Sequence, residues 1–227
     1  MRMKIFDVRK SYDKFTLFIN RLEMPGGKIY GMIGPNGCGK TTAMKLMAGL
    51  ISPDSGEIDH EGLTHRDITM IMRKPYLLHD TVLNNLIYPL KIRKLKPDPV
   101  KLEHYLEIAG LSDLRNENAL GLSGGEQQKL ALIRALIFSP KMILTDEAFS
   151  NMDIESVAFF EKYIINLQNS SETSITWVII SHRLSDIIHL CDHVYFLSNG
   201  EIKAEGKPDE LLIDPENADL KRYLQYS

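Results

Sequence analysis

Hydrophobic and polar positions alternate along the first third of the chain in a way that predicts strands. Residues 5–33 are strand-like: Phe15–Ile19 alternates apolar and polar side chains, and Lys28–Ile33 is a short apolar run. After a glycine-rich turn, Thr41–Leu50 has the spacing of a helix, and Ile68–Met72 has the pattern of another buried strand. This part of the chain is therefore expected to form strands around one helix.

The middle of the chain has a different pattern. From about residue 80 to residue 118 it is helical and rich in charge, and the basic run Lys91–Lys96 ends before Pro97 and Pro99. No strand pattern returns until Lys141–Leu144. We therefore expect an inserted helical subdomain here, with the basic run on its solvated face.

Predicted strands and helices alternate after residue 141. They are a helix over about 153–168, a strand over 177–181, a helix over 185–190 and a strand over 194–198. Such alternation is typical of a parallel sheet with crossover helices. Asn199-Gly200 then predicts a type I′ hairpin into Ile202.

Composition narrows the classes of protein. With 227 residues and 44% apolar side chains, the chain can bury one large core, and a net charge of −3 gives no basic footprint for nucleic acid. Two cysteines, Cys38 and Cys191, are too few for a disulfide framework and favour a reducing compartment such as the cytoplasm. No secretory signal and no apolar run of membrane-spanning length is expected, so any pore must come from another chain.

A glycine loop carries the first candidate chemistry. Gly34–Thr41 fits G-x-x-x-x-G-K-[ST], the pattern of a phosphate-binding P-loop, and it lies between a predicted strand and a predicted helix. Glycines let backbone N–H groups converge on phosphate, Lys40 is expected to reach the β and γ phosphates, and Thr41 to ligate Mg²⁺. The alternative is an ordinary glycine turn. The predicted nucleotide-binding residues of this loop are Gly34, Pro35, Asn36, Gly37, Cys38, Gly39, Lys40, Thr41 and Thr42.

Two adjacent acids follow a buried strand. Met142–Thr145 delivers Asp146 and Glu147 at the carboxyl end of the strand, where α/β sheets build ligand sites. We expect Asp146 to hold Mg²⁺ and Glu147 to polarise the attacking water as general base. The alternative is a pair of acids that simply begins a solvated loop.

The segment Leu122-Ser123-Gly124-Gly125-Glu126 lies between these two motifs. The order of P-loop, LSGGE, Asp146-Glu147 and a strand-terminal His182 resembles the nucleotide-binding subunit of ATP-binding-cassette (ABC) transporters, over nearly the whole chain. The resemblance implies an α/β fold with a P-loop NTPase parallel-sheet core, an N-terminal antiparallel β subdomain and an inserted α-helical subdomain. One domain over 1–227 is expected, with 1–79 and 140–227 as the ATP-binding core and 80–139 as the helical subdomain.

The resemblance also implies a dimer. Ser123, Gly124 and Gly125 of one subunit cap the γ-phosphate that is bound to the P-loop of the other. The residue types agree with this role, because Ser123 can cap a helix that begins near Glu126, and glycine amides and a helix N-terminus favour an anion. A plain helix-capping turn is the alternative. A homodimer with two ATP molecules is expected.

Further roles come from the resemblance. His182 contacts the γ-phosphate and positions Glu147, so that Lys40, Glu147 and His182 form the catalytic set. Asp153 lies in the loop that faces the dimer partner, although it could instead cap the next helix. Tyr12 lies where an aromatic ring stacks on adenine.

Three positions depart from the pattern or vary within it. The family usually has glutamine where this chain has Arg73, and proline where it has Ala148. Arginine has five donors and no acceptor, so it cannot ligate a cation; we expect Arg73 to turn toward phosphate or to point away. Cys38 is interpreted either as a tolerated small residue or as a reactive thiol at a helix N-terminus.

The sequence thus predicts an ATP-hydrolysing ABC subunit on the inner face of the cell membrane, with ATP and Mg²⁺ as ligands. Its expected partners are a transmembrane permease subunit, a second copy of the chain and, for an importer, an extracytoplasmic solute-binding protein; nucleic acid is not expected. The cargo class is a small solute such as an oxyanion or amino acid. The alternatives are a soluble non-transport ABC ATPase, an exporter subunit, and a catalytically weak regulatory cassette.

Overall fold

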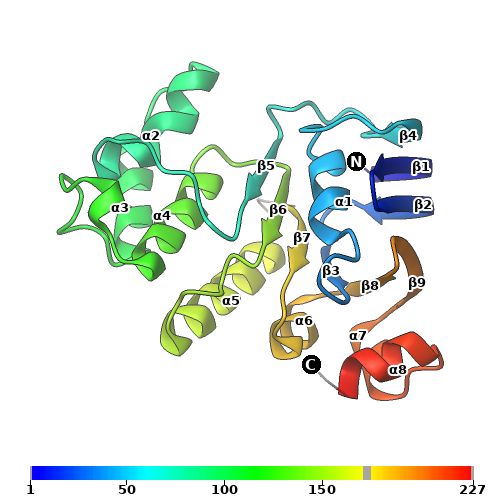
Figure 1. The fold of residues 1–227 in the computed structure, drawn as a ribbon. Coiled ribbons are helices and arrows are strands. Elements are labelled where there is room, and N and C mark those ends of the chain that lie inside the picture. The colour runs from blue at the N-terminus through cyan, green and yellow to red at the C-terminus, as the bar shows by residue number, and fades with distance from the viewer. Residues whose placement is uncertain (1, 171–174, 226–227) are drawn as a thin grey trace.

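The structure is a computed structural model, and it describes residues 2–170 and 175–225. Within these residues the strands form one nine-stranded sheet (Figure 1). The strands are β1 (Arg2–Tyr12), β2 (Phe15–Pro25), β3 (Ile29–Ile33), β4 (Ser55–Asp59), β5 (Ile68–Ile71), β6 (Met142–Asp146), β7 (Thr176–Ile180), β8 (His193–Ser198) and β9 (Glu201–Gly206).

The helices lie mainly after the third strand. They are α1 (Lys40–Met47), α2 (Val82–Arg93), α3 (Pro99–Ile108), α4 (Gly124–Leu136), α5 (Ile154–Asn169), α6 (Leu184–Leu190), α7 (Pro208–Ile213) and α8 (Ala218–Gln225), with a 3₁₀ turn, η1, over Ala119–Gly121. Among the described residues, no helix is long and apolar enough to cross a membrane.

The sheet has a parallel part and an antiparallel part. Its order is β4-β1-β2-β9-β8-β3-β7-β6-β5, and all neighbours from β8 to β5 run parallel. β1 pairs antiparallel with β2 and with β4, while the β8–β9 hairpin links the two parts, because β9 also pairs with β2. The predicted fold class is confirmed, and the antiparallel part is continuous with the parallel core.

Alternation along the central strands creates a core on each face of the sheet. In β7, Trp177 and Ile179 belong to one buried cluster, and Val178 and Ile180 belong to the other. This is the two-residue period of a strand that is buried on both faces. One cluster also contains the buried side chains of α1, and the other those of α2, α4, α5 and α6. The sheet therefore holds α1 and the later helices on opposite faces.

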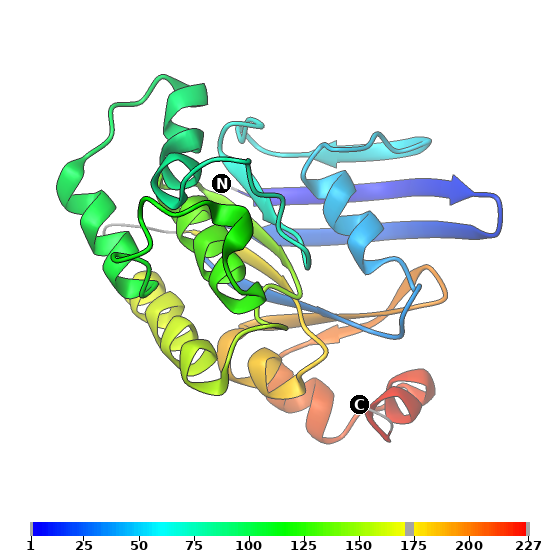
Figure 2. The ribbon, with the colours of Figure 1, turned by 60° about the vertical axis from the view of Figure 1, so that its left-hand side comes forward.

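The helices α2, α3 and α4 lie together beside the sheet, beyond its β5 edge (Figures 1 and 2). α2 packs on α4, and α4 also contacts β5. The buried amide of Asn85 joins this group to the segment before it: its Oδ1 accepts from the N–H of Leu78, and its Nδ2 donates to carbonyls including that of Leu78. The division into a core and an 80–139 subdomain remains a prediction that agrees with this arrangement.

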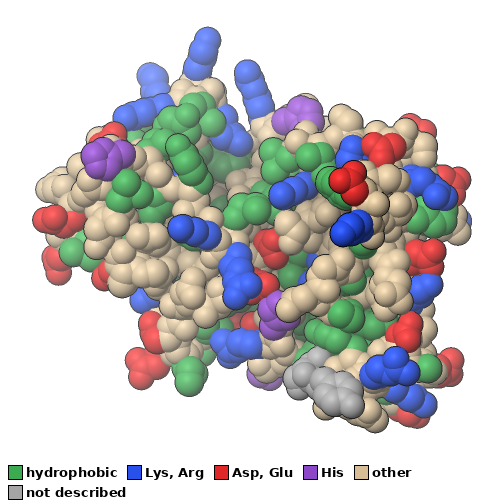
Figure 3. Space-filling view, in the orientation of Figure 1, with side chains coloured by type: hydrophobic (Ala, Val, Ile, Leu, Met, Phe, Trp, Pro, Cys, Tyr) green, Lys and Arg blue, Asp and Glu red, His purple; other side chains and the backbone are tan. Residues whose placement is uncertain are grey.

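The basic run at the end of α2 is on the surface. Figure 3 shows Lys and Arg side chains projecting above this end of the molecule. Lys91, Lys94 and Lys96 are exposed, as the sequence predicts. Arg93 is half-buried instead, because its guanidinium lies 3.7 Å from the ring centroid of Phe138.

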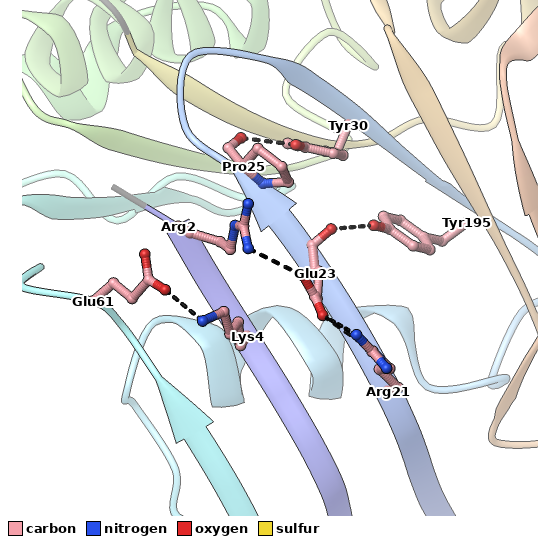
Figure 4. A network of polar contacts seen from close by, with 8 residues as sticks. All are labelled: Arg2, Lys4, Arg21, Glu23, Pro25, Tyr30, Glu61 and Tyr195. Atoms are coloured by element: carbon pink, nitrogen blue, oxygen red, sulfur yellow. Dashed lines mark hydrogen bonds and ion pairs between the residues drawn. The ribbon is translucent and has the colours of Figure 1, made fainter.

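Polar contacts join the end of β2 to the central strands, and β1 to the segment after β4 (Figure 4). The hydroxyl of Tyr195 donates to the carbonyl of Glu23 at 2.8 Å, and that of Tyr30 donates to the carbonyl of Pro25 at 2.7 Å. Lys4 pairs with Glu61 at 2.6 Å, next to the edge strand β4. The two tyrosine contacts fix the antiparallel part of the sheet against β3 and β8.

The local turn predictions have different outcomes. Asn199 and Gly200 have φ values of 51° and 80°, and β8 and β9 pair antiparallel, which confirms the predicted hairpin. The residue types of Ser52–Gly56 are typical of a turn, but the last two residues of this segment begin the strand β4. That strand is largely exposed and lacks an apolar alternation, so its pairing with β1 makes it a strand.

Candidate functional site

The glycine loop runs from the end of β3 to the start of α1. Gly34 has φ 143°, and a Cβ there would lie 2.0 Å from the carbonyl oxygen of Leu197, so a side chain is excluded. Gly39 has φ 111° and is the N-cap of α1, where no side chain occupies the helix end. The loop therefore presents the N-terminal N–H groups of α1 uncovered by a capping side chain, which favours an anion.

Lys40 begins α1 and lies under the loop. Its side chain is largely buried, and Nζ donates to the carbonyl of Gly34 at 2.6 Å and to that of Pro35 at 3.0 Å. A buried ammonium needs such partners to offset its desolvation. These contacts hold the charge of Lys40 inside the curve of the loop, where an anion would meet it.

Asp146 ends β6 beside α1. The hydroxyl of Thr41 donates to Asp146 Oδ2 at 2.6 Å, although the two residues lie 105 positions apart in the chain. Asp146 is buried and pairs in register with Ile180 of β7. Two oxygen donors of the type that Mg²⁺ prefers thus lie together next to the glycine loop. No group of three or more His, Cys, Asp or Glu side chains with metal-binding geometry occurs among the described residues.

Glu147 reverses the chain directly after β6. Its φ of 54° is left-handed, which is uncommon for a residue with a side chain, and its N–H donates to the carbonyl of Ile180 at 3.0 Å. Oε1 of its carboxylate lies 2.9 Å from Nε2 of His182, which follows β7. Because β6 and β7 are neighbours, the strand-end acids and His182 meet as the sequence predicts.

Arg73 contacts the same carboxylate. Its Nε lies 3.1 Å from Oε2 of Glu147, so the carboxylate lies between an arginine and a histidine. The expectation that Arg73 points away is therefore wrong, and the alternative, that it turns toward phosphate, stays a prediction. Arg73 follows β5, which is the neighbour of β6 in the sheet, and this brings its guanidinium within reach of Glu147.

One cavity of about 320 Å³ connects these groups. Its lining combines the predicted aromatic ring, the loop and the strand-end residues: Tyr12, Phe15, Asn36, Gly37, Gly39, Lys40, Thr41, Thr42, Asp146, Glu147 and His182. Phe15 is not predicted from the sequence. Its ring lies against Gly39, 2.9 Å from where a Cβ would be, so Phe15 shapes the floor next to the loop.

Cys38 is in the loop but faces away from solvent. It is buried, and burial raises the pKa of its thiol above the ordinary value, which opposes thiolate formation. The reactive-thiol interpretation is therefore wrong, because desolvation outweighs the neighbouring ammonium of Lys40. As a member of the loop, Cys38 can offer a nucleotide only its backbone.

Asp186 supports the loop that carries His182 and is not predicted from the sequence. Its fully buried carboxylate accepts from the hydroxyl of Ser181 at 2.7 Å and pairs with Arg183 Nε at 3.2 Å. An acid inside a short amphipathic helix is a weak signal, because the same pattern is common on exposed faces. Asp186 holds the residues on both sides of His182.

Comparison with known proteins identifies this arrangement. Residues 19–150, more than half of the chain, match the family described as ABC transporter. The chain belongs to the ABC transporter family. As a member, it is an ATP-binding and ATP-hydrolysing subunit of a transport system.

Several relatives of this ABC subunit are ATP-binding proteins of import systems. It is 35% identical to the tungstate uptake system ATP-binding protein TupC of Peptoclostridium acidaminophilum, over 91% of this chain and 99% of that protein. It is 30% identical to the spermidine/putrescine import protein PotA of Spiroplasma citri and 34% identical to the Fe(3+) import protein FbpC of Photobacterium profundum. These matches cover 95% and 89% of this chain, which spans only 64% and 60% of those two proteins.

A solved structure supports the fold. The ABC subunit is similar to CbiO1 of Clostridium perfringens, part of the ABC transporter complex CbiONQ, with a TM-score of 0.79. The match covers 94% of this chain and 91% of that chain at 22% identity, so it bears on the fold alone.

Ser123, Gly124 and Gly125 of the LSGGE segment, which we call the signature residues, lie outside the cavity. Ser123 caps α4 in a reciprocal box with Glu126: the Glu126 N–H donates to Ser123 Oγ at 3.4 Å, and the Ser123 N–H to Glu126 Oε2 at 2.8 Å. Asp153 caps α5 through the N–H of Ser156 at 2.7 Å. None of Ser123, Gly124, Gly125 and Asp153 lines the cavity. Their nucleotide contacts therefore require a second subunit, or do not occur.

Proposed function

We propose that this ABC subunit binds Mg²⁺-ATP in the cavity beside the glycine loop and hydrolyses it with Glu147 as general base. The observation that carries the proposal is the position of the Glu147 carboxylate, 2.9 Å from His182 and directly after the Thr41–Asp146 contact. A base that is oriented by a second group, next to a phosphate-binding loop, is the arrangement that phosphoryl transfer to water needs.

Different residues of the cavity are proposed to bind different parts of Mg²⁺-ATP. Lys40, the loop amides and the N-terminus of α1 supply positive charge for the triphosphate. Thr41 and Asp146 offer oxygen ligands that fit Mg²⁺, which would neutralise charge on the β and γ phosphates. Tyr12 is half exposed at the cavity rim and offers a ring for the adenine base.

The chemical step is an in-line displacement. A water oxygen bonds to the γ-phosphorus while the bond from that phosphorus to the β–γ bridging oxygen breaks, giving ADP and phosphate. The proton of the attacking water passes to Glu147, and His182 holds the carboxylate through Oε1. Lys40 stabilises the charge that develops on the transferred group.

Two copies of the chain form the working unit in this proposal. Ser123 and the adjacent glycines Gly124 and Gly125 begin α4 on the surface, outside the cavity of their own chain. Their amides and the positive end of α4 suit a γ-phosphate that is presented by a partner copy. Asp153, the N-cap of α5, would face the same partner copy.

We propose that the permease binds in a groove beside α2 and α4. Its cavity of about 290 Å³ lies between the segment after β5 and the helices α2 and α4. The side chain of Tyr76 is 79% exposed there and Ile92 is also exposed, so the groove offers apolar contact to a helix of the membrane subunit. In this proposal the subunit lies on the inner face of the membrane.

The proposed cargo is an oxyanion, taken up with the help of an extracytoplasmic solute-binding protein. The support is the likeness to the tungstate uptake protein over nearly the full length of both chains. The polyamine and iron relatives are longer than this chain and support import as the direction.

Replacing the base tests the proposed function. We expect Glu147→Gln to lower kcat for Mg²⁺-ATP by about 10²-fold or more while ATP affinity is retained, because the amide keeps the shape but cannot take a proton. Glu155→Gln, in the first turn of α5, is the matched control. Hydrolysis by Glu147→Gln at the wild-type rate would falsify the assignment.

A further inference from the structure

The carboxylate of Glu147 has a separate cationic or hydrogen-bonding partner on each oxygen. His182 Nε2 lies 2.9 Å from Oε1, and Arg73 Nε lies 3.1 Å from Oε2. The Glu147 side chain is only 12% exposed, whereas that of Arg73 is 68% exposed. The acid is therefore fixed in the interior, and the arginine is the partner with room to move.

The backbone of Arg73 is fixed, even though its side chain is exposed. The buried amide of Gln128, in α4, donates from Nε2 to the carbonyl of Arg73 at 2.8 Å. Its Oε1 accepts from the N–H of Asn151 at 3.3 Å, in the loop that follows Glu147. Gln128 thus joins the segment that carries Arg73 to the loop that carries the base.

The residues around Arg73 line the groove that is proposed above to bind the permease. Thr69–Met72, Pro75 and Tyr76 line that groove, while the side chain of Arg73 reaches the other way to Glu147. A helix seated in the groove would contact the backbone on both sides of Arg73.

A guanidinium is a strong partner for this acid. It is always charged and gives a charge-assisted hydrogen bond to a carboxylate. A carboxylate that takes a proton from water loses its charge, so the charge-assisted contact with Arg73 weakens during the chemical step and opposes the proton transfer. A neutral amide, the usual group at this position in the resemblance described above, makes no such ion pair.

We propose that Arg73 is a positioning residue that clamps Glu147 in a low-activity arrangement in the isolated subunit. This proposal rests on the proposed role of Glu147 as base. In this proposal Arg73 lowers the rate of ATP hydrolysis by the isolated subunit. Gln128 holds the segment of Arg73 next to the loop that follows Glu147.

The kinetic test compares variants of the isolated full chain with Mg²⁺-ATP. Arg73→Gln and Arg73→Met remove the charge and are expected to raise kcat about fivefold, with KM for ATP unchanged. Fivefold corresponds to about 1 kcal/mol at RT ≈ 0.59 kcal/mol, the upper end for a partly exposed ion pair. Arg73→Lys keeps the charge and is expected to stay near wild type. Lys74→Gln is the matched control, because Lys74 has no ion pair among the described residues.

A second readout is independent of turnover. ¹⁵N NMR of arginine side chains should give a distinct Nε–H signal for Arg73, assigned by its loss in Arg73→Lys. We expect this signal to move to the position of a solvated arginine in Glu147→Gln. An Arg73 signal that does not respond to Glu147→Gln would show that the ion pair is absent and would overturn the proposal.

The outcomes separate the two proposals. If Glu147→Gln hydrolyses ATP normally, the role of Glu147 fails, and the clamp fails with it. If Glu147→Gln is inactive but Arg73→Gln shows no rise in kcat, or shows a fall, only the clamp is overturned. A rise in both Arg73→Gln and Arg73→Met, with Lys74→Gln unchanged, supports it.

Discussion

At the residue scale, the catalytic chemistry depends on where two strand ends meet. Glu147 leaves β6 in a left-handed conformation, and its carboxylate lies between His182 and Arg73. Strained backbone at a site of this kind is kept only where surrounding contacts fix it, and here the Glu147 N–H donates to the carbonyl of Ile180 in β7. The base is thus held by its backbone and by both carboxylate oxygens.

The sequence predicts part of this site. The loop residues and Asp146-Glu147 follow from local patterns, since each lies at the end of a recognisable strand. The contact between Arg73 and Glu147 could not be predicted, because it depends on the pairing of β5 with β6 across 74 positions of sequence. Cys38 shows the same limit: its place at a helix N-terminus favours a thiolate, but its burial is decided by tertiary packing.

Thiol chemistry gives a prediction at this scale. Both Cys38 and Cys191 are buried, and burial raises the pKa of each thiol, so each thiol is less ionised than a free cysteine at the same pH. We expect iodoacetamide at pH 8 to leave the native chain unmodified and to alkylate both cysteines after denaturation. Mass spectrometry of the intact protein checks this, and labelling of native Cys38 at the rate of a free thiol would contradict it.

At the element scale, α4 connects the separate parts of the site. Its N-terminus carries the signature residues, its first turns place the buried Gln128 between Arg73 and Asn151, and its later residues line the groove. The sequence predicts a helix that begins near Glu126 with Ser123 as its cap. The role of Gln128 is not visible in the sequence, because a polar residue next to Gln127 is expected to face solvent.

Removing the Gln128 amide should destabilise the fold. Gln128→Leu leaves the carbonyl of Arg73 and the N–H of Asn151 without this partner, which costs about 1–3 kcal/mol for a buried polar group. For a domain of this size that is a fall in Tm of roughly 2–4 °C per kcal/mol. Thermal unfolding followed by circular dichroism measures it.

Gln127→Leu is the control for this prediction, since Gln127 is only partly buried and water can replace its contacts. If Gln128→Leu lowers Tm no more than Gln127→Leu does, Gln128 does not hold the two loops together.

At the scale of the whole molecule, the ATP cavity and the signature residues are separate. The cavity lies at the N-terminus of α1 and beside the residues that end β6 and follow β7, whereas Ser123 and its neighbours begin α4, whose buried side chains belong to the cluster on the other face of the sheet. The parallel core was predictable from the alternation of strands and helices. The edge strand β4 was not, because its pairing with β1 rather than its own residues makes it a strand.

Dimerisation tests the central claim most directly. We expect the Glu147→Gln chain to shift from 25.8 kDa toward twice that mass by light scattering when Mg²⁺-ATP is added. Gly124→Asp in the same background should bind ATP but stay monomeric. A Cβ at Gly124 meets only Asn151 Cβ at 3.8 Å and an acid suits the first turn of α4, so the fold is kept while the new charge repels the partner's phosphate. If Glu147→Gln binds ATP and remains at 25.8 kDa, or if Gly124→Asp dimerises equally well, the proposed two-copy site is wrong.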